Sequence, residues 1–166
     1  MKYICKRNNA VAVLLSASLV TAILVFISLA SFGIWIRGIW ETAAMIFAVA
    51  AIQISQKHLF SYFEYITDPD DEMIYRNRIT VIRVAGKNRT SLFTLGLKNL
   101  SAVVPYKERK KLKEEYGTPK ARYSYCTDIF PKESYILVFE NNGEAVFMRI
   151  ECDKDFISEI EKRMGV

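Results

Sequence analysis

The first third of the chain is dominated by apolar side chains, and the pattern changes abruptly after residue 56. Residues 10–36 contain no charged side chain, and a second apolar stretch covers residues 42–54. An α-helix rises about 1.5 Å per residue, so about 20 residues cross the hydrocarbon core of a bilayer. The pattern predicts a transmembrane hairpin at residues 10–56, with antiparallel helices at about 10–34 and 38–56.

Four residues near the helix ends are predicted to anchor the hairpin at the membrane interface: Trp35, Arg37, Trp40 and Lys57. Tryptophan prefers the headgroup level of a bilayer, so a tight turn is expected at residues 35–41. Lysine and arginine concentrate on the cytoplasmic side, and three of them lie in residues 1–9. We therefore expect a multi-pass protein of the cell membrane with both termini and the domain after residue 57 in the cytoplasm.

Other interpretations of the apolar segments are possible. A cleaved signal peptide has an apolar region of only about 7–15 residues, and its removal would leave the second apolar stretch unexplained. A buried hairpin of a soluble core is disfavoured by the uncharged length of residues 10–36. Small residues are frequent in both helices and allow close helix packing in lipid. The sequence leaves open whether they serve packing within the hairpin or a homo-oligomer.

After residue 57, short β-rich runs alternate with turn residues, which predicts about seven short antiparallel strands. Six candidate strands lie at residues 60–66, 79–85, 90–95, 121–127, 134–139 and 145–150, and residues 72–75 and 97–104 are candidates for a further short strand. Gly86 and Asn88 favour a hairpin turn, as do Asn142 and Gly143. In and after the last strand, Val146, Met148, Ile150 and Cys152 share one face and Arg149 and Glu151 lie on the other, which is typical of a half-buried strand.

At the end of the chain, the apolar residues recur at the spacing of an α-helix. Asp153 is a suitable N-cap, and Phe156, Ile157, Ile160 and Met164 form one apolar stripe over residues 153–164. The expected fold class is therefore an N-terminal two-helix transmembrane hairpin followed by an α+β domain at residues 57–166. In that domain, one amphipathic helix covers an antiparallel roll of strands.

Several segments together resemble the bacterial pleckstrin-homology-like (PH-like) domains that are anchored next to a membrane. These segments come after the hairpin and lie at residues 65–70, 82–87, 95–100 and 151–156. In addition, residues 123–131 and 135–140 resemble parts of small membrane proteins of Gram-positive bacteria. The resemblance implies a curved seven-stranded roll closed at one end by the C-terminal helix. It covers residues 60–164 and carries no catalytic motif, and the group is mostly uncharacterised.

Charge and cysteine content exclude several classes of function. Four of the 23 basic residues and one of the 18 acidic residues precede Lys57. Residues 57–166 therefore contain 19 basic and 17 acidic residues. This nearly neutral domain is not expected to bind nucleic acid. Cys5, Cys126 and Cys152 are widely spaced, which suggests neither a zinc site nor a disulfide framework. No catalytic, metal or cofactor motif is recognised, so we expect a protein that is not an enzyme.

The candidate contact residues for an anionic lipid or a protein partner are basic. The densest group lies at residues 107–113, which is expected to form a short surface helix: Lys107, Arg109, Lys110, Lys111 and Lys113. The second group flanks the first hairpin turn: Lys87 and Arg89. In the eukaryotic pleckstrin homology domains the corresponding loop binds phosphoinositides, but this loop has fewer basic residues, so a solvated turn is the better interpretation.

Two functions are consistent with this pattern. The first is a PH-like binding or scaffold module that the hairpin holds at the cytoplasmic leaflet, where it docks an anionic lipid or a membrane or cytoplasmic protein. The second is an accessory subunit of a larger membrane complex that acts through its transmembrane helices.

Overall fold

The computed structural model describes residues 1–5, 10–32, 37–67, 77–141 and 143–164. The described chain divides into two compact units. One is the helical unit, Arg7–Ser61, and the other is the β unit, which combines Met1–Lys6 with Tyr62–Val166. The N-terminal residues, which we expected to be a separate cytoplasmic segment, thus belong to the folded β unit.

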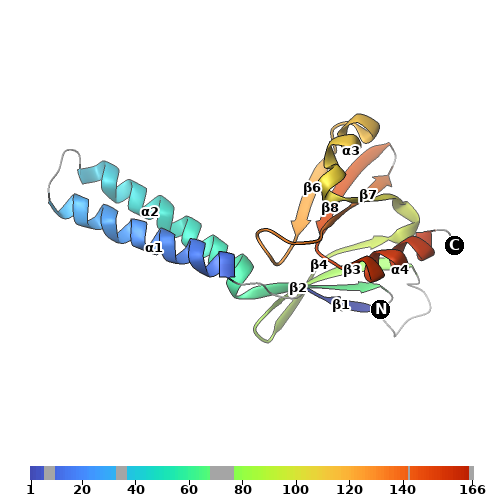
Figure 1. Cartoon of the computed structure of the whole chain (residues 1–166), viewed down its shortest axis with the longest axis horizontal. Coiled ribbons are helices and arrows are strands. Elements are labelled where there is room, and N and C mark those ends of the chain that lie inside the picture. The colour runs from blue at the N-terminus through green and yellow to red at the C-terminus, as the bar shows by residue number, and fades with distance from the viewer. Residues whose placement is uncertain (6–9, 33–36, 68–76, 142, 165–166) are drawn as a thin grey trace. The chain divides into compact units, whose positions relative to one another are not determined.

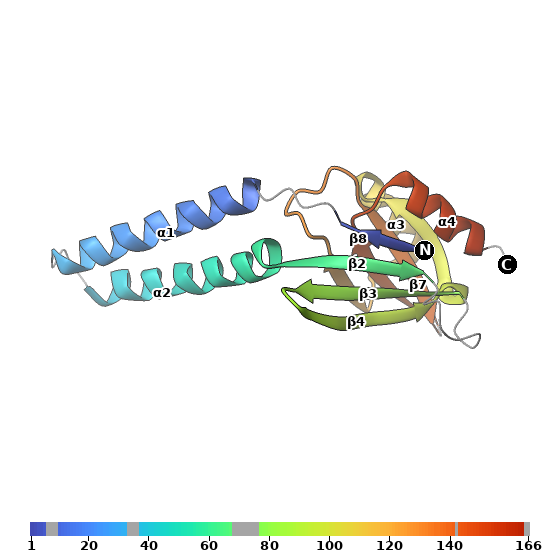
Figure 2. The ribbon, with the colours of Figure 1, turned by 90° about the horizontal axis from the view of Figure 1, so that it is seen from below.

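The helical unit is an antiparallel pair, α1 (Ala10–Ser31) and α2 (Arg37–Ile54), whose helices lie side by side (Figures 1 and 2). Both helices are long and apolar enough to cross a membrane. Their buried side chains are all alanines, which lets the two backbones approach closely. They are Ala12 and Ala30 of α1 and Ala44 and Ala51 of α2. Packing between the two helices, one of the two interpretations of the small residues, is therefore present.

Several hydroxyl side chains of the helical unit bond to backbone carbonyls of the same unit. Thr21 Oγ1 donates to the carbonyl of Ala17 at 3.0 Å, and Ser28 Oγ donates to that of Leu24 at 2.9 Å. Such back-bonding is what an apolar surrounding requires of a hydroxyl. A π-helical turn, η1 (Ser55–Leu59), ends α2, and Ser61 Oγ closes it by donating to two of its carbonyls.

The β unit contains two four-stranded sheets among its described residues, so the predicted single seven-stranded antiparallel roll is wrong in strand number and pairing. The first sheet has the order β1-β2-β3-β4, and Figure 2 shows its four strands side by side in this order. Its strands are β1 (Lys2–Ile4), β2 (Ser61–Thr67), β3 (Arg78–Ala85) and β4 (Asn88–Gly96). The predicted strand at residues 72–75 lies outside the described residues.

The second sheet has the order β5-β7-β8-β6. Its strands are β5 (Leu100–Pro105), β6 (Ala121–Tyr125), β7 (Tyr135–Asn141) and β8 (Glu144–Ile150). β6 pairs with β8 in parallel, which the all-antiparallel prediction missed. A 3-10 turn, η3 (Leu97–Asn99), precedes β5, and this edge strand continues through Pro105 because an edge position tolerates a residue without a backbone donor.

Both predicted hairpin turns are confirmed. Ala85 pairs with Asn88, so the β3–β4 connection has two turn residues, with Gly86 at φ +60. The β7–β8 connection closes between Asn141 and Glu144, with Gly143 at φ +78. Glycine adopts positive φ at no steric cost, which explains why the turns form at these positions.

The main core of the β unit contains side chains from both sheets and from α4 (Lys154–Met164). Tyr65, Ile79, Met148 and Phe156 are fully buried there. The helix begins as predicted, because Asp153 Oδ1 accepts a hydrogen bond from the backbone N–H of Phe156 at 2.9 Å. Phe156, Ile157 and Ile160 are its buried face.

Candidate anion-binding cleft

A second, smaller apolar cluster holds helix α3 (Arg109–Tyr116) against the second sheet. Leu112 of α3 is 1% exposed and belongs to the same cluster as Ile136 and Val138 of β7 and Phe147 of β8. Alternate residues of β7, Leu137 and Phe139, belong instead to the main core. Since side chains alternate across a strand, α3 and α4 cover opposite faces of this sheet.

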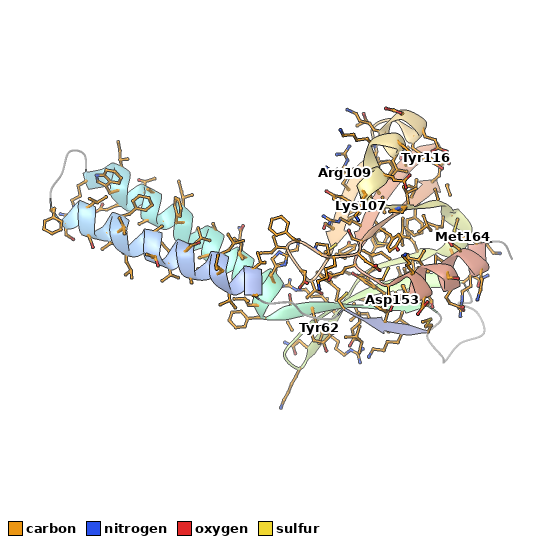
Figure 3. The ribbon with its side chains drawn as sticks, viewed as in Figure 1. Tyr62, Lys107, Arg109, Tyr116, Asp153 and Met164 are labelled. Atoms are coloured by element: carbon orange, nitrogen blue, oxygen red, sulfur yellow. The ribbon has the colours of Figure 1, made fainter. Side chains whose placement is uncertain are left out.

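A cleft of about 430 Å³ opens where α3 meets β6, β7 and β8. Arg109, one of the residues that line it, is labelled at α3 in Figure 3. This volume lies within the range of small-molecule sites. Its apolar floor contains Ile136 and Phe147. The polar residues that line it are Tyr106, Arg109, Lys110, Lys113, Arg122, Tyr123, Ser124 and Arg149.

Five of these lining residues are basic and none is acidic. No ion pair is found for any of the five within the described part of the chain. Basic residues nearby behave differently: Lys111 pairs with Glu108 at 2.7 Å, and Lys120 pairs with Glu144. The cleft therefore concentrates positive charge that the described carboxylates do not neutralise, and such a site attracts anions.

The ring of Tyr106 contacts two of the guanidinium groups. The Arg149 Cζ atom is 3.5 Å from the ring centroid, and the Arg109 Cζ atom is 4.7 Å from it. Both distances are within the range of cation–π attraction. Arg149 also donates from Nε and Nη2 to Ser134 Oγ, at 3.2 and 3.1 Å. These contacts fix the orientation of Arg149 on the strand and of Arg109 on the helix.

The structure divides the basic segment at residues 107–113 into two sets. Arg109, Lys110 and Lys113 line the cleft, whereas Lys107 and Lys111 do not. Helix α3 follows a 3-10 turn, η4 (Tyr106–Glu108), and ends at Tyr116, immediately before Gly117, which has φ +69. The surface helix expected in this segment is therefore present.

Sequence reasoning missed the part of the cleft that β6 and β8 contribute. Arg122 and Arg149 were not candidates, although the alternation of residues 145–150 places Phe147 and Arg149 on the face opposite Met148. The parallel register pairs Arg122 with Phe147 and Ser124 with Arg149. That register joins strands that are distant in sequence, so no local pattern signals it.

Lys87 and Arg89, the other predicted contact residues, are not brought to the cleft. Lys87 occupies the β3–β4 turn. Arg89 Nη2 binds Glu64 Oε2, and Lys2 Nζ lies 3.1 Å from the same oxygen. The side chain of Glu64 is only 4% exposed, so Arg89 takes part in holding a buried carboxylate and not in a basic surface patch.

Three of the four predicted interface residues lie at the start of α2 or just after its end. Arg37 and Trp40 are in its first turns, not in a separate turn, and Arg37 Nε donates to Glu41 Oε1 at 2.7 Å. Trp40 stacks on Phe26 of α1, with ring centroids 5.8 Å apart. Lys57 lies in the π-helical turn η1, and Trp35 lies outside the described residues.

The three cysteines of the β unit are buried, and none of them forms a disulfide among the described residues. Burial raises the pKa of Cys5 to about 12 and also raises the pKa of Cys152. Because these pKa values are raised on folding, the stability that depends on neutral thiols is fully present below their ordinary pKa of about 8.5. It is lost as the pH rises from there through the folded-state values.

We expect Cys5, Cys126 and Cys152 to resist iodoacetamide at pH 8 while the protein is folded. The thiolate is the reactive form, and all three side chains are at most 3% exposed. Mass spectrometry would count the alkylated thiols before and after unfolding in guanidinium. Alkylation of the folded protein at the rate of an exposed thiol would contradict the prediction.

Neither metal-binding groups nor similarity to known proteins indicates a class of function for this chain. Among the described residues, no group of three or more His, Cys, Asp or Glu side chains could hold a metal ion. No protein-family model, curated protein or solved structure matches this chain.

Proposed function

We propose that this chain is a membrane-anchored binding module without catalytic activity. The helical unit spans the cell membrane, and the β unit docks an anionic lipid or an anionic surface of a protein at the cytoplasmic leaflet. The PH-like character of the β unit, which its sequence segments suggest, is part of this proposal.

The observation that carries the proposal is a cleft lined by five basic residues, none of which forms an ion pair among the residues that the structure describes. Each basic residue near an anionic leaflet contributes about 1 kcal/mol of attraction. No acidic residue lines the cleft, and Glu108 of the preceding turn η4 is paired with Lys111. Anchoring the β unit also raises its effective concentration at the membrane, so weak contacts there suffice for binding.

The connectivity of the chain supports a hairpin that enters and leaves the membrane on one side. β1 precedes α1 in sequence and β2 follows α2, yet β1 and β2 are hydrogen-bonded neighbours, with Tyr3 opposite Tyr65. A chain that leaves a sheet and returns to the same sheet crosses a bilayer an even number of times. The basic residues at both ends of the hairpin favour the cytoplasmic side.

The test is hydrogen–deuterium exchange of the full-length protein in nanodiscs. We expect amides of α3 and β6 to exchange more slowly in discs that contain phosphatidylglycerol than in discs of phosphatidylcholine alone. High salt should remove the difference, because it screens charge at exposed sites. Equal exchange in both lipids would remove anionic lipid from the proposal and leave a protein partner.

A matched comparison distinguishes the binding module from a function carried by the helices. The hairpin at residues 10–59 is replaced by an unrelated membrane hairpin of the same length. Retained slowing of α3 exchange supports the β unit as the functional part. Loss of the effect in a chain that still inserts would favour the accessory-subunit alternative.

A further inference from the structure

Resting on the proposed function, we infer that the cleft between α3 and the second sheet is a binding site for a phosphate ester, either free or in a lipid headgroup. The shared chemistry is a tetrahedral dianion that bears an organic group. The arginines supply planar donors for the phosphate, and the apolar floor faces the organic part.

Three of the five basic residues are arginines that come from three different elements. Arg109 lies on α3, Arg122 on β6 and Arg149 on β8. A guanidinium presents its N–H groups as a rigid fork that matches phosphate oxygens, which a lysine does not do. Arg122 and Arg109 have no hydrogen-bond acceptor among the described residues, so their donors remain available.

The cleft is organised before a ligand enters. Tyr106 holds the guanidinium groups of Arg109 and Arg149 on its ring, and Ser134 takes two N–H groups of Arg149. Fixing these long side chains in the free protein removes part of the entropy cost of binding. A patch that serves only diffuse attraction has no need of such order.

The amount of charge favours a phosphate over a carboxylate. A phosphate monoester carries about −1.5 to −2 charges at neutral pH and offers three acceptor oxygens. One carboxylate supplies a single charge and two acceptor oxygens, so it would neutralise and engage fewer of the five cations. Ile136 and Phe147 form a floor that suits the carbon skeleton of an ester better than a bare ion.

The test uses the full-length protein in phosphatidylcholine nanodiscs and isothermal titration calorimetry. The soluble probe is glycerol phosphate, which carries both a phosphate and an organic group. In the lipid arm, phosphatidic acid or phosphatidylserine is added to the discs, and exchange at α3 and β6 is measured. We expect saturable binding of a phosphate probe, or protection by phosphatidic acid that phosphatidylserine does not give.

Matched double variants separate the cleft from general charge. Lys113→Gln/Arg122→Gln removes two cations that line the cleft, and Lys107→Gln/Lys111→Gln removes two from the same region that do not. We expect the first variant to weaken binding by about ten-fold or more, because hydrogen bonds to charged groups are lost. The second should change the affinity by less than about two-fold.

A third variant tests the organisation of the cleft without a change of charge. Tyr106→Leu removes the ring that contacts Arg109 and Arg149, and we expect it to weaken binding of the same probe. Exchange at buried amides of β3 reports whether each variant is folded.

The outcomes are distinct. Binding of glycerol phosphate without protection by phosphatidic acid identifies a free ester as the ligand, and the reverse result identifies a lipid. Equal weakening in both double variants, or equal protection by phosphatidylserine and phosphatidic acid, would overturn the phosphate site and leave charge-driven docking intact. Absence of binding by every probe would overturn both the phosphate site and docking to anionic lipid.

Discussion

Removal of the first six residues is expected to unfold the β unit. Tyr3 of β1 packs against Phe156 with ring centroids 5.3 Å apart and stacks on Tyr65 at 6.2 Å. Cys5 is 3% exposed and belongs to the same core. Truncation of one core aromatic alone costs about 3–5 kcal/mol, and a whole domain is stable by only about 5–15 kcal/mol.

The loss of β1 also leaves backbone groups of β2 without partners. The N–H of Thr67 donates to the carbonyl of Met1 at 2.8 Å, and the N–H of Cys5 donates to the carbonyl of Phe63 at 3.3 Å. Buried backbone groups that lose such bonds carry a desolvation cost. The edge of the first sheet would therefore be lost together with part of the core.

The measurement compares two soluble chains by urea unfolding and by the dispersion of their amide NMR signals. One comprises residues 62–166. In the other, a short hairpin turn replaces residues 7–61, because β1 and β2 are antiparallel neighbours at Ile4 and Glu64. We expect a cooperative transition only in the second. The same unfolding midpoint in both chains would show that β1 is dispensable.

The second large effect concerns the buried carboxylate of Glu64. Lys2 of β1 and Arg89 of β4 both bind its Oε2 atom, so the contact joins three strands of the first sheet. We expect Lys2→Met/Arg89→Met to lower the free energy of unfolding by about 3 kcal/mol. A buried charge that loses its partners has a cost of this size.

Hydrogen exchange at amides of β2 and β3 in the full-length protein would measure this loss. Addition of Glu64→Gln to the double variant should restore most of the lost free energy of unfolding, because the buried negative charge of Glu64 is then absent. The control is Lys111→Met/Lys120→Met, which removes two cations from exposed ion pairs and should cost less than about 1 kcal/mol. A loss of the same size in the control would contradict the assignment to burial.

Local chemistry explains which elements could be predicted from the sequence. The β3–β4 and β7–β8 hairpins have glycines where the turns require positive φ, at Gly86 and Gly143. Helix α4 has an N-cap at Asp153 and an apolar stripe at helical spacing. Each of these signals lies within a few residues, so tertiary context was not needed to interpret it.

The features that were missed depend on contacts between distant segments. β1 has only three residues, which is too short for a periodic signal, and its partner β2 lies about 60 residues away. The parallel pairing of β6 with β8 brings Arg122 beside the strand that carries Arg149. The basic segment at residues 107–113 therefore predicted one wall of the cleft, while the other wall depends on register.

The most direct measurement of the central claim is arginine side-chain NMR of the full-length protein in phosphatidylcholine nanodiscs, titrated with glycerol phosphate and, separately, with phosphatidic acid added to the discs. The proposal predicts that the Nε–Hε signals of Arg109, Arg122 and Arg149 shift together and saturate with one of these probes. The signals of Arg37 and Arg163, which are ion-paired with Glu41 and Glu159, should stay in place. Equal shifts at all five arginines, or no shift with either probe, would contradict a phosphate site in the cleft.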